Sequence, residues 1–376
     1  MRIEPAVPAQ ALAAIRSALT AADATVVDAP IVQPLNELLD LAGEAMRARL
    51  FVVQAEGGAE TCLRPDFTVA VARAHIDSGA GLGRYAYEGP AFRASPGADR
   101  PEQFVQLGVE LFTPSGAAVE TDVEIASLAW RASAAGGRSD LTLWLGDVGL
   151  FGAFIESLSL APALAARLKR VAGRPRLLAA ELARAGQPPQ TADESQLAGM
   201  LAGLDAVQAG ALLEEVWALA GVEPVGGRGA AEIAARLVRR AEAAKAPSLS
   251  PAQAAAIREF MAISDAPAAG LARLRGLAGA RIAPALDAWA QRLEALEAIT
   301  PAGALRLAPA LAHAFDYYDG LTFEVRSEAL GADRPVAAGG RYDGLLARLG
   351  ASPRQSAGGA VGCVVRPWRA FAGGES

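Results

Sequence analysis

Polar residues that could hold a small ligand lie on one face of a strand-like stretch. QFVQLGVELF, residues 103–112, alternates so that Gln106, Gly108 and Glu110 share a face while apolar residues take the other. A glycine between an amide and a carboxylate leaves space for a ligand that donates and accepts hydrogen bonds. The alternative that the sequence leaves open is an ordinary strand whose polar side faces solvent.

Two further stretches could complete such a site. RYAYEGPAFR, residues 84–93, ends in Arg93, which would offer a planar cation to a carboxylate or phosphate if its face joined the first one. LRPDFT leads into an expected helix, with Asp66 as its cap and Thr68 in its first turn. Capping alone would be a sufficient structural role for Asp66.

The stretch AHAFDYYDGLTFEV, residues 312–325, places Tyr317 and Tyr318 directly before an alternating, strand-like run. Such a run could line a small-molecule pocket or be ordinary sheet. Further on, AAGGRYDGLLARLG predicts a strand, a glycine pair that permits close backbone approach, and a helix that starts near Asp343.

The elements that must position these residues fall into three blocks. Residues 1–154 alternate between short helices and strands, residues 155–299 show apolar residues at helical spacing, and residues 300–376 return to strands and glycine turns. We therefore expect one α+β domain, discontinuous in sequence, with a helical insertion. The insertion could pack on itself or dock a partner through an exposed apolar stripe.

Composition excludes several classes of protein. Of the 376 residues 52% are hydrophobic, but charges interrupt every long apolar stretch, so we expect neither a membrane span nor a secretory signal and place the chain in the cytoplasm. A net charge of −6 argues against a broad surface for nucleic acid. With only Cys62, Cys363, His75 and His313, we expect no metal site, and no motif predicts a cofactor.

Taken in order, LRPDFT, RYAYEGPAFR, QFVQLGVELF, FDYYDGLTFEV and AAGGRYDGLL resemble the catalytic domain of histidyl-tRNA synthetase. The resemblance implies a class II aminoacyl-tRNA synthetase-like fold, an antiparallel sheet flanked by helices, formed by residues 1–154 and 300–376 around the insertion at 155–299. It also implies a histidine-type ligand pocket. Its residues would be Asp66, Thr68, Arg93, Gln106, Glu110, Tyr317 and Tyr318, with the first two and Gln106 near the amino group and Glu110 and Tyr318 near the imidazole.

The sequence departs from the synthetase pattern where the nucleotide would bind. His313 stands where the family has an arginine, and Ser95 stands where its second class motif has a glutamate. Arg366 replaces a glycine of the third motif and would crowd a nucleotide. Because a neutral imidazole cannot replace a permanent, forked cation, we expect adenylation to be lost and assign no catalytic residue.

We also expect no C-terminal anticodon-binding domain, because too little chain follows the last motif. This combination resembles the family of regulatory subunits of ATP phosphoribosyltransferase. The resemblance implies a non-catalytic subunit with three partners: a short-form catalytic subunit, a second copy in a homodimer within a hetero-oligomer, and free histidine. Such a subunit is required for the first step of histidine biosynthesis and is implicated in feedback by histidine.

Two alternatives remain open from the sequence. One is a truncated histidyl-tRNA synthetase-like ligase that still adenylates an amino acid, and the other is a stand-alone amino-acid sensor that serves another partner.

Overall fold

The computed structural model describes most of the chain and divides it into two compact units. Unit 1 comprises Met1–Ser157 and Arg258–Ser376, and unit 2 comprises Leu158–Ile257. The described residues are 1–19, 23–54, 57–58, 60–95, 97, 100–114, 118–172, 175–185, 249–279, 282–311, 315 and 317–374, together with single residues and pairs between 208 and 219.

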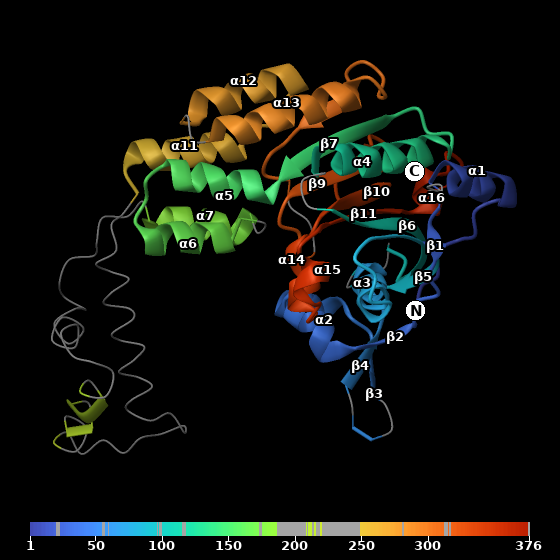
Figure 1. The fold of residues 1–376 in the computed structure, drawn as a ribbon, viewed down its shortest axis with the longest axis horizontal. Helices are drawn as coiled ribbons and strands as arrows, with labels where there is room; N and C mark the ends of the chain where they lie inside the picture. Colours follow the sequence, from blue (N-terminus) through green and yellow to red (C-terminus); the bar gives the residue numbers. More distant parts are fainter. Residues whose placement is uncertain are drawn as a thin grey trace. The chain divides into compact units, whose positions relative to one another are not determined.

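Unit 1 is built on an eight-stranded sheet. Strands β5, β6, β11, β10, β9 and β7 each pair antiparallel with the next strand in this order. The two edge strands, β1 and β8, pair parallel to β5 and β7. In spatial order the strands are β1 (Thr25–Val26), β5 (Gly83–Phe92), β6 (Gln103–Thr113), β11 (Gly359–Val365), β10 (Ala337–Arg341), β9 (Leu321–Ser327), β7 (Leu141–Asp147) and β8 (Leu305–Leu307) (Figure 1).

From Gln106 to Phe112 strand β6 is buried on both faces, whereas Val105 near its start is 37% exposed. Leu107, Val109 and Leu111 are at most 2% exposed, as the alternation predicts, but Gln106 and Glu110 on the other face are each only 1% exposed. The solvent-facing interpretation of this strand is therefore wrong. A strand buried on both faces must satisfy its polar side chains within the protein.

Helices cover both faces of the sheet. Helix α4 (Ala118–Ala134) packs along β9, β10 and β11, with α1 (Ala9–Leu19) and α13 (Ala283–Glu297) against it (Figure 1). On the other side, apolar residues of α2 (Leu35–Ala42), α3 (Thr68–Asp77) and α14 (Gly344–Arg348) share one buried cluster with ring residues of β5 and β6. This packing places α3 and α14 next to the polar face of β6.

The remaining elements of unit 1 are short or lie at its ends. A three-stranded sheet pairs β2 (Val32–Pro34), β4 (Glu60–Leu63) and β3 (Val52–Gln54). Several helices start at a proline, whose fixed φ suits the first turn. The other helices are η1 (Glu44–Arg49), α5 (Val148–Ser157), α12 (Pro267–Leu277), α15 (Pro353–Ser356) and α16 (Pro367–Ala370).

Unit 2 contains α6 (Pro162–Arg170), α7 (Pro175–Ala185) and most of α11 (Pro251–Met261), and its leucines at helical spacing are buried. The helices expected around residues 201–221 and 230–246 fall mostly outside the described residues. Helices α12 and α13 belong to unit 1, whereas the predicted insertion extends to residue 299. The predicted domain boundaries stay a prediction. Among the described helices, none combines the length and apolarity needed to span a membrane.

Candidate functional site

Glu110 is a buried carboxylate that three hydroxyl groups bind. Its Oε1 accepts hydrogen bonds from Thr68 Oγ1 at 2.8 Å and from the Tyr87 hydroxyl at 3.2 Å, and its Oε2 accepts one from the Tyr342 hydroxyl. The donors come from three elements, because Thr68 starts α3, Tyr87 lies opposite Gly108 on β5, and Tyr342 follows β10. Glu110 therefore joins the sheet to the helix side of the core. We call these four residues the Glu110 cluster.

Two glycines make room for this cluster. A Cβ at Gly362 on β11 would overlap the Glu110 carboxylate, and a Cβ at Gly108 would overlap the Tyr87 ring. The sequence predicts that Gly108 leaves space for a ligand, and this prediction is wrong. Tyr87 fills the space and delivers its hydroxyl to Glu110.

Asp66 lies beside this cluster and keeps an unused acceptor. Its Oδ2 faces the Tyr317 hydroxyl at 3.4 Å, and Oδ1 is buried without a hydrogen-bond partner among the described residues. Asp66 is not the cap of α3 as predicted: Phe67 takes the N-cap position, and no side chain caps the helix. A hydrogen bond from the Thr68 amide still lowers the pKa of the Asp66 carboxyl, so Asp66 keeps a local contact at the start of α3.

Gln106 adds a second unused acceptor on the same strand face. Its side chain is 1% exposed, and Oε1 has no partner within the described part of the chain. Buried polar atoms are normally bonded, so an unpaired one calls for an explanation such as a ligand. Asp66 and Gln106 together would accept hydrogen bonds from a donor-rich group.

Burial sets the pKa values of the two carboxylates. Desolvation raises the pKa of Glu110 to about 7, against the hydrogen bonds of Tyr342, Thr68 and Tyr87, which favour the ionised form. Desolvation likewise raises the pKa of Asp66 to about 6, although the charge of Arg93 lowers it. Both groups therefore change charge near neutral pH, and each would hold its proton less tightly beside a cationic ligand.

The tyrosines of the AHAFDYYDG stretch pack against this site. The Tyr317 and Tyr318 rings lie 4.8 Å apart, and the Tyr318 ring lies 6.3 Å from that of Tyr342. Burial raises the pKa of both hydroxyls, so they stay neutral donors. The neighbouring Asp316 and the predicted lesion at His313 lie outside the described residues.

Two arginines, Arg93 and Arg366, lie around the Phe104 ring near the start of β6. Arg93 donates from Nε to the Pro65 carbonyl at 2.9 Å, and its guanidinium lies 5.4 Å from the Phe104 ring centre. Arg366 stacks more closely on Phe104, at 3.6 Å, and forms a buried ion pair with Glu4. Arg366 and Arg93 thus face the same Phe104 ring, and Arg366 pairs with the N-terminal segment. Its predicted position in a nucleotide region stays a prediction.

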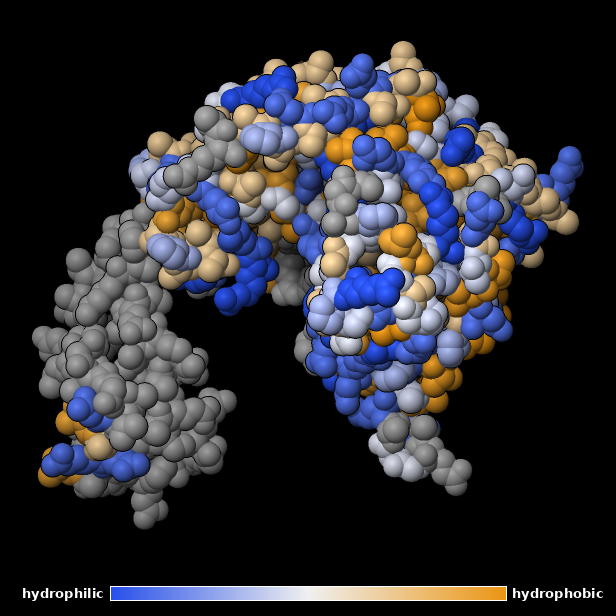
Figure 2. Space-filling view, viewed as in Figure 1, coloured by the Kyte–Doolittle hydropathy of each residue, from blue (hydrophilic) through white to orange (hydrophobic). Residues whose placement is uncertain are grey.

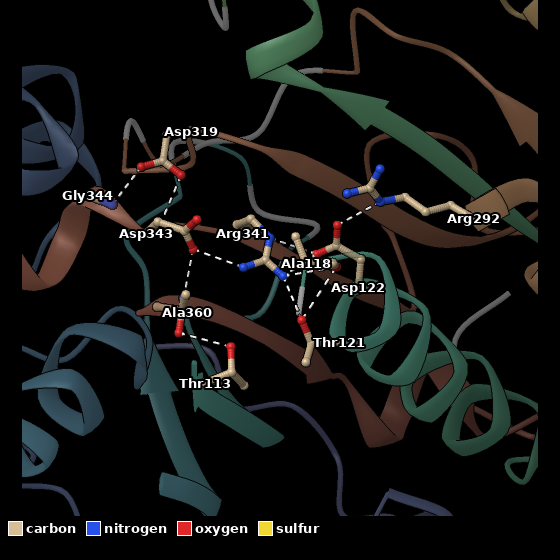
Figure 3. A network of polar contacts seen from close by, with 11 residues as sticks. Thr113, Ala118, Thr121, Asp122, Arg292, Asp319, Arg341, Asp343, Gly344 and Ala360 are labelled. Atoms are coloured by element: carbon tan, nitrogen blue, oxygen red, sulfur yellow. Dashed lines mark hydrogen bonds and ion pairs between the residues drawn. The ribbon is translucent and has the colours of Figure 1, made fainter. Parts of the chain in front are cut away.

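A polar network links the tyrosine stretch to the helices on the opposite face (Figure 3). Asp319 accepts hydrogen bonds from the amides of Asp343 and Gly344 at 3.0 and 2.7 Å. Asp343 also binds Arg341, whose guanidinium reaches Asp122 of α4 from Nε at 2.9 Å. Asp122 is 1% exposed and also accepts from Arg292 of α13 at 2.8 Å. The network fixes the position of Asp319, one residue after Tyr318.

The structure connects several of the seven predicted residues through contacts, charge or strand alternation. Hydrogen bonds join Thr68 to Glu110 and Tyr317 to Asp66, and the Tyr317 ring contacts that of Tyr318. Arg93 acts on Asp66 through its charge, and strand alternation puts Gln106 on the face of Glu110. Their role in binding a ligand stays a prediction.

Sequence reasoning missed Tyr87, Tyr342 and Glu4. Tyr87 shares the parity of Arg93, and Tyr342 stands in the GGRYDG stretch, so strand alternation could have indicated both. Nothing in the sequence pairs Glu4 with Arg366, because the two residues lie at opposite ends of the chain.

Comparison with known proteins first defines the class. The chain matches the family model described as Histidyl-tRNA synthetase over residues 10–223 and 211–364. It also superposes on a solved structure from Bacillus halodurans titled as an ATP phosphoribosyltransferase regulatory subunit/histidyl-tRNA synthetase, with a TM-score of 0.62 and 21% identity, covering 96% of this chain and 77% of that one. The fold is therefore that of the histidyl-tRNA synthetase class, as the motifs predict.

Curated relatives narrow this class. The ATP phosphoribosyltransferase regulatory subunit of Mesorhizobium japonicum is 36% identical to this chain, over 86% of the chain and 87% of the relative. That of Brucella anthropi is 33% identical, over 90% of the chain and 91% of the relative. The chain belongs to the family of ATP phosphoribosyltransferase regulatory subunits, which confirms the predicted resemblance.

Proposed function

We propose that this chain is a regulatory subunit of ATP phosphoribosyltransferase that binds free histidine and catalyses no reaction itself. The names of its relatives support the regulatory role. The observation that carries the ligand is the set of buried acceptors on one face: Glu110, held by three hydroxyls, beside the unpartnered oxygens of Asp66 and Gln106.

The chemistry of free histidine suits these acceptors. Its ammonium group has three N–H donors, and Asp66 Oδ1 and Gln106 Oε1 are two buried acceptors without a partner. A carboxylate can accept roughly four hydrogen bonds, and the described hydroxyls supply three to Glu110, so one imidazole N–H can still be accepted. Arg93 would face the ligand's carboxylate.

Loss of adenylation is the second part of the proposal. Ser95 cannot make the contact of a glutamate, and its carbonyl accepts a hydrogen bond from Arg2. Arg366 is committed to Glu4 and Phe104. Removing one stabilising group typically costs about a hundredfold or more in rate, so several such changes together would leave little activity.

The partner would be the short-form catalytic subunit of ATP phosphoribosyltransferase, in a cytoplasmic hetero-oligomer that serves the first step of histidine biosynthesis. Histidine can regulate that enzyme only if it binds two states of the complex with different affinity, by about 1–3 kcal/mol in typical cases. We expect one state to hold the Glu110 cluster in its ligand-bound arrangement.

A homodimer is the simplest assembly for the chain itself. Apolar residues gather over β1 and β2 at the lower right of Figure 2, where Val26 is 79% and Val32 is 47% exposed. Exposed apolar groups of this kind commonly mark interfaces. A Val32→Asp variant should shift the purified chain toward monomer in analytical ultracentrifugation, and an unchanged mass would exclude this surface.

Calorimetric titration of histidine, into the isolated chain and then into the complex with the catalytic subunit, tests the function. We expect saturable binding in both cases and a change in affinity on assembly. If histidine binds only when the catalytic subunit is present, the histidine site would lie on that partner.

ATP–pyrophosphate exchange with histidine should stay at background, and clear exchange by the isolated chain would favour a ligase. Failure to co-purify with the catalytic subunit would contradict the proposed partnership.

A further inference from the structure

The tyrosine hydroxyls beside the candidate pocket form a chain of hydrogen bonds with a defined direction. Tyr317 donates its hydroxyl proton to Asp66 Oδ2 at 3.4 Å, because an ionised carboxylate can only accept. A second hydrogen bond joins the side chains of Tyr317 and Tyr318. Since the one proton of Tyr317 is directed at Asp66, Tyr318 is the donor in this second bond. The chain therefore runs from Tyr318 through Tyr317 to Asp66.

This direction determines what the Tyr318 oxygen offers to a ligand. A phenol has one proton, so a hydroxyl that donates it to a neighbour can only accept further hydrogen bonds. The Tyr318 hydroxyl also lies close enough to Glu110 for the charge of that carboxylate to raise its pKa. A ligand group that contacts both Tyr318 and Glu110 therefore meets two acceptors and no donor.

Glu110 is ionised when it accepts a hydrogen bond from a ligand. Thr68, Tyr87 and Tyr342 already donate to it, and a carboxylate accepts roughly four hydrogen bonds. A protonated carboxyl would have to donate one hydrogen bond itself, which is incompatible with three hydroxyl donors and a ligand N–H. Tyr85, opposite Glu110 on β5, directs its hydroxyl to a histidine of α3 instead.

An ionised Glu110 lacks a nearby positive charge. The side chains that most affect its pKa are three neutral hydroxyls and Asp66. Within the described part of the chain, Cys62, Cys363 and Arg93 also act on Glu110 or Asp66, and burial raises the pKa of both thiols, so these stay neutral. Arg93 is a cation, but its charge acts on Asp66. A buried carboxylate without a counter-charge is strongly unfavourable.

We propose, building on the proposed function, that the pocket binds histidine with its imidazole ring charged, as imidazolium. Both ring N–H groups then have an acceptor, one in Glu110 and the other in the Tyr318 oxygen. The ring also supplies the positive charge that Glu110 lacks. A neutral ring has one N–H and one bare nitrogen, and that nitrogen would face an oxygen that cannot donate to it.

The affinity for histidine should therefore be greatest near neutral pH. The histidine ring has an ordinary pKa of about 6.5, so imidazolium becomes scarce as the pH rises. Desolvation raises the pKa of Glu110 to about 7 and that of Asp66 to about 6, so the pocket loses its ionised acceptors as the pH falls through these values. From about pH 7.5 to 8.5 the affinity should fall about tenfold, with about one proton taken up per histidine bound. If the ring bound in its neutral form, the affinity would stay nearly constant over this interval.

Calorimetric titration of the full chain, in two buffers of different ionisation enthalpy, measures the affinity and the proton uptake together. The matched probe is 1,2,4-triazole-3-alanine, whose ring has the same shape but is a much weaker base and stays neutral. It should bind about tenfold or more weakly than histidine at neutral pH. Equal affinities that do not change with pH would overturn the imidazolium inference and leave the proposed function standing. If histidine does not bind at all, the proposed function fails, and the inference fails with it.

Two variants assign the effect to its residues. Glu110→Gln keeps the shape of the side chain and removes the negative charge, so the fall in affinity with pH should flatten. Tyr318→Phe removes the second acceptor and should reduce the preference for histidine over the triazole. Glu88→Gln, in the exposed pair with Arg16, is the control and should keep both the fall and the preference. A fall that persists in Glu110→Gln, or a full preference that persists in Tyr318→Phe, would contradict the assignment.

Discussion

Glu110 and Glu4 are both buried carboxylates of unit 1, but their partners differ in charge. Neutral hydroxyls of Thr68, Tyr87 and Tyr342 bind Glu110, whereas the cation of Arg366 binds Glu4. Desolvation raises the pKa of both carboxyls, but the charge and hydrogen bond of Arg366 oppose the rise at Glu4, whereas neutral hydroxyls oppose it at Glu110. The Glu110 cluster is therefore suited to respond to a ligand, and the Glu4–Arg366 pair is suited to hold a fixed position.

Removing the cation from the Glu4–Arg366 pair should produce the largest effect on stability. Arg366→Met leaves Glu4 buried without a counter-charge, and losing one partner of a buried ion pair typically costs about 3–5 kcal/mol. Urea unfolding would measure this loss. Arg275→Met, in the exposed pair with Asp287, is the control and should change stability by less than about 1 kcal/mol. Similar losses in the two variants would mean that the Glu4–Arg366 pair stabilises nothing.

Crowding the hydroxyl-bound region should have the next largest effect. A Cβ at Gly362 overlaps Glu110, whose carboxylate three hydroxyls hold in place, so Gly362→Ala should cost about 1–3 kcal/mol and abolish histidine binding. Gly276, on helix α12, has open space around its Cβ position and serves as the matched control, since alanine there favours the helix. Thermal unfolding and calorimetry would measure both variants. Wild-type histidine affinity in Gly362→Ala would exclude Glu110 from the site.

A milder change tests whether Glu110 contacts the ligand. Glu110→Gln keeps the shape but removes the charge, so histidine affinity should fall about tenfold while the chain stays folded. Glu88→Gln on neighbouring β5 provides the control, because that carboxylate lies at the surface. Calorimetry and circular dichroism would report affinity and folding separately. Equal affinities in the two variants would show that the Glu110 cluster is purely structural.

The last prediction concerns pH. Because the pKa of Glu110 is raised from 4.5 to about 7 in the folded chain, the folded state holds this proton more tightly than the unfolded state does. The resulting stability is present below about pH 4.5 and disappears as the pH rises to about 7. Glu110→Gln should therefore flatten the fall of unfolding free energy across this interval, by no more than about 1.4 kcal/mol per pH unit. Parallel curves for wild type and variant would contradict the raised pKa.

The sequence predicts the class and the helix–sheet division because these depend on local patterns. Alternation identifies β5 and β6, and the register places Tyr85 opposite Glu110 and Gly89 opposite Gln106, so the two predicted faces coincide. The family motifs, read in order, then identify the fold. Residue spacing alone also predicts that α14 starts near Asp343, and the helix begins at the next residue.

What the sequence does not predict depends on contacts between distant segments. Gly108 reads as an open space because alternation does not show that the Tyr87 ring covers it. Asp66 reads as a cap, although the helix begins one residue later than that role requires. Glu4 reads only as a charge that interrupts an apolar start, and its partner lies 362 residues away. Such pairings follow from the folded sheet and not from periodicity.

Asp319 connects the tyrosines of the candidate site to helices α14 and α4. Its carboxylate holds the amides of Asp343 and Gly344, and Asp343 in turn holds Arg341 against α4 (Figure 3). A histidine-induced shift of Tyr317 would therefore require either that these hydrogen bonds lengthen or that helix α14 and Arg341 move with the loop. In the second case, ligand binding would displace Arg341 and α4 on the far side of the sheet. A catalytic subunit bound to that side could respond to the displacement.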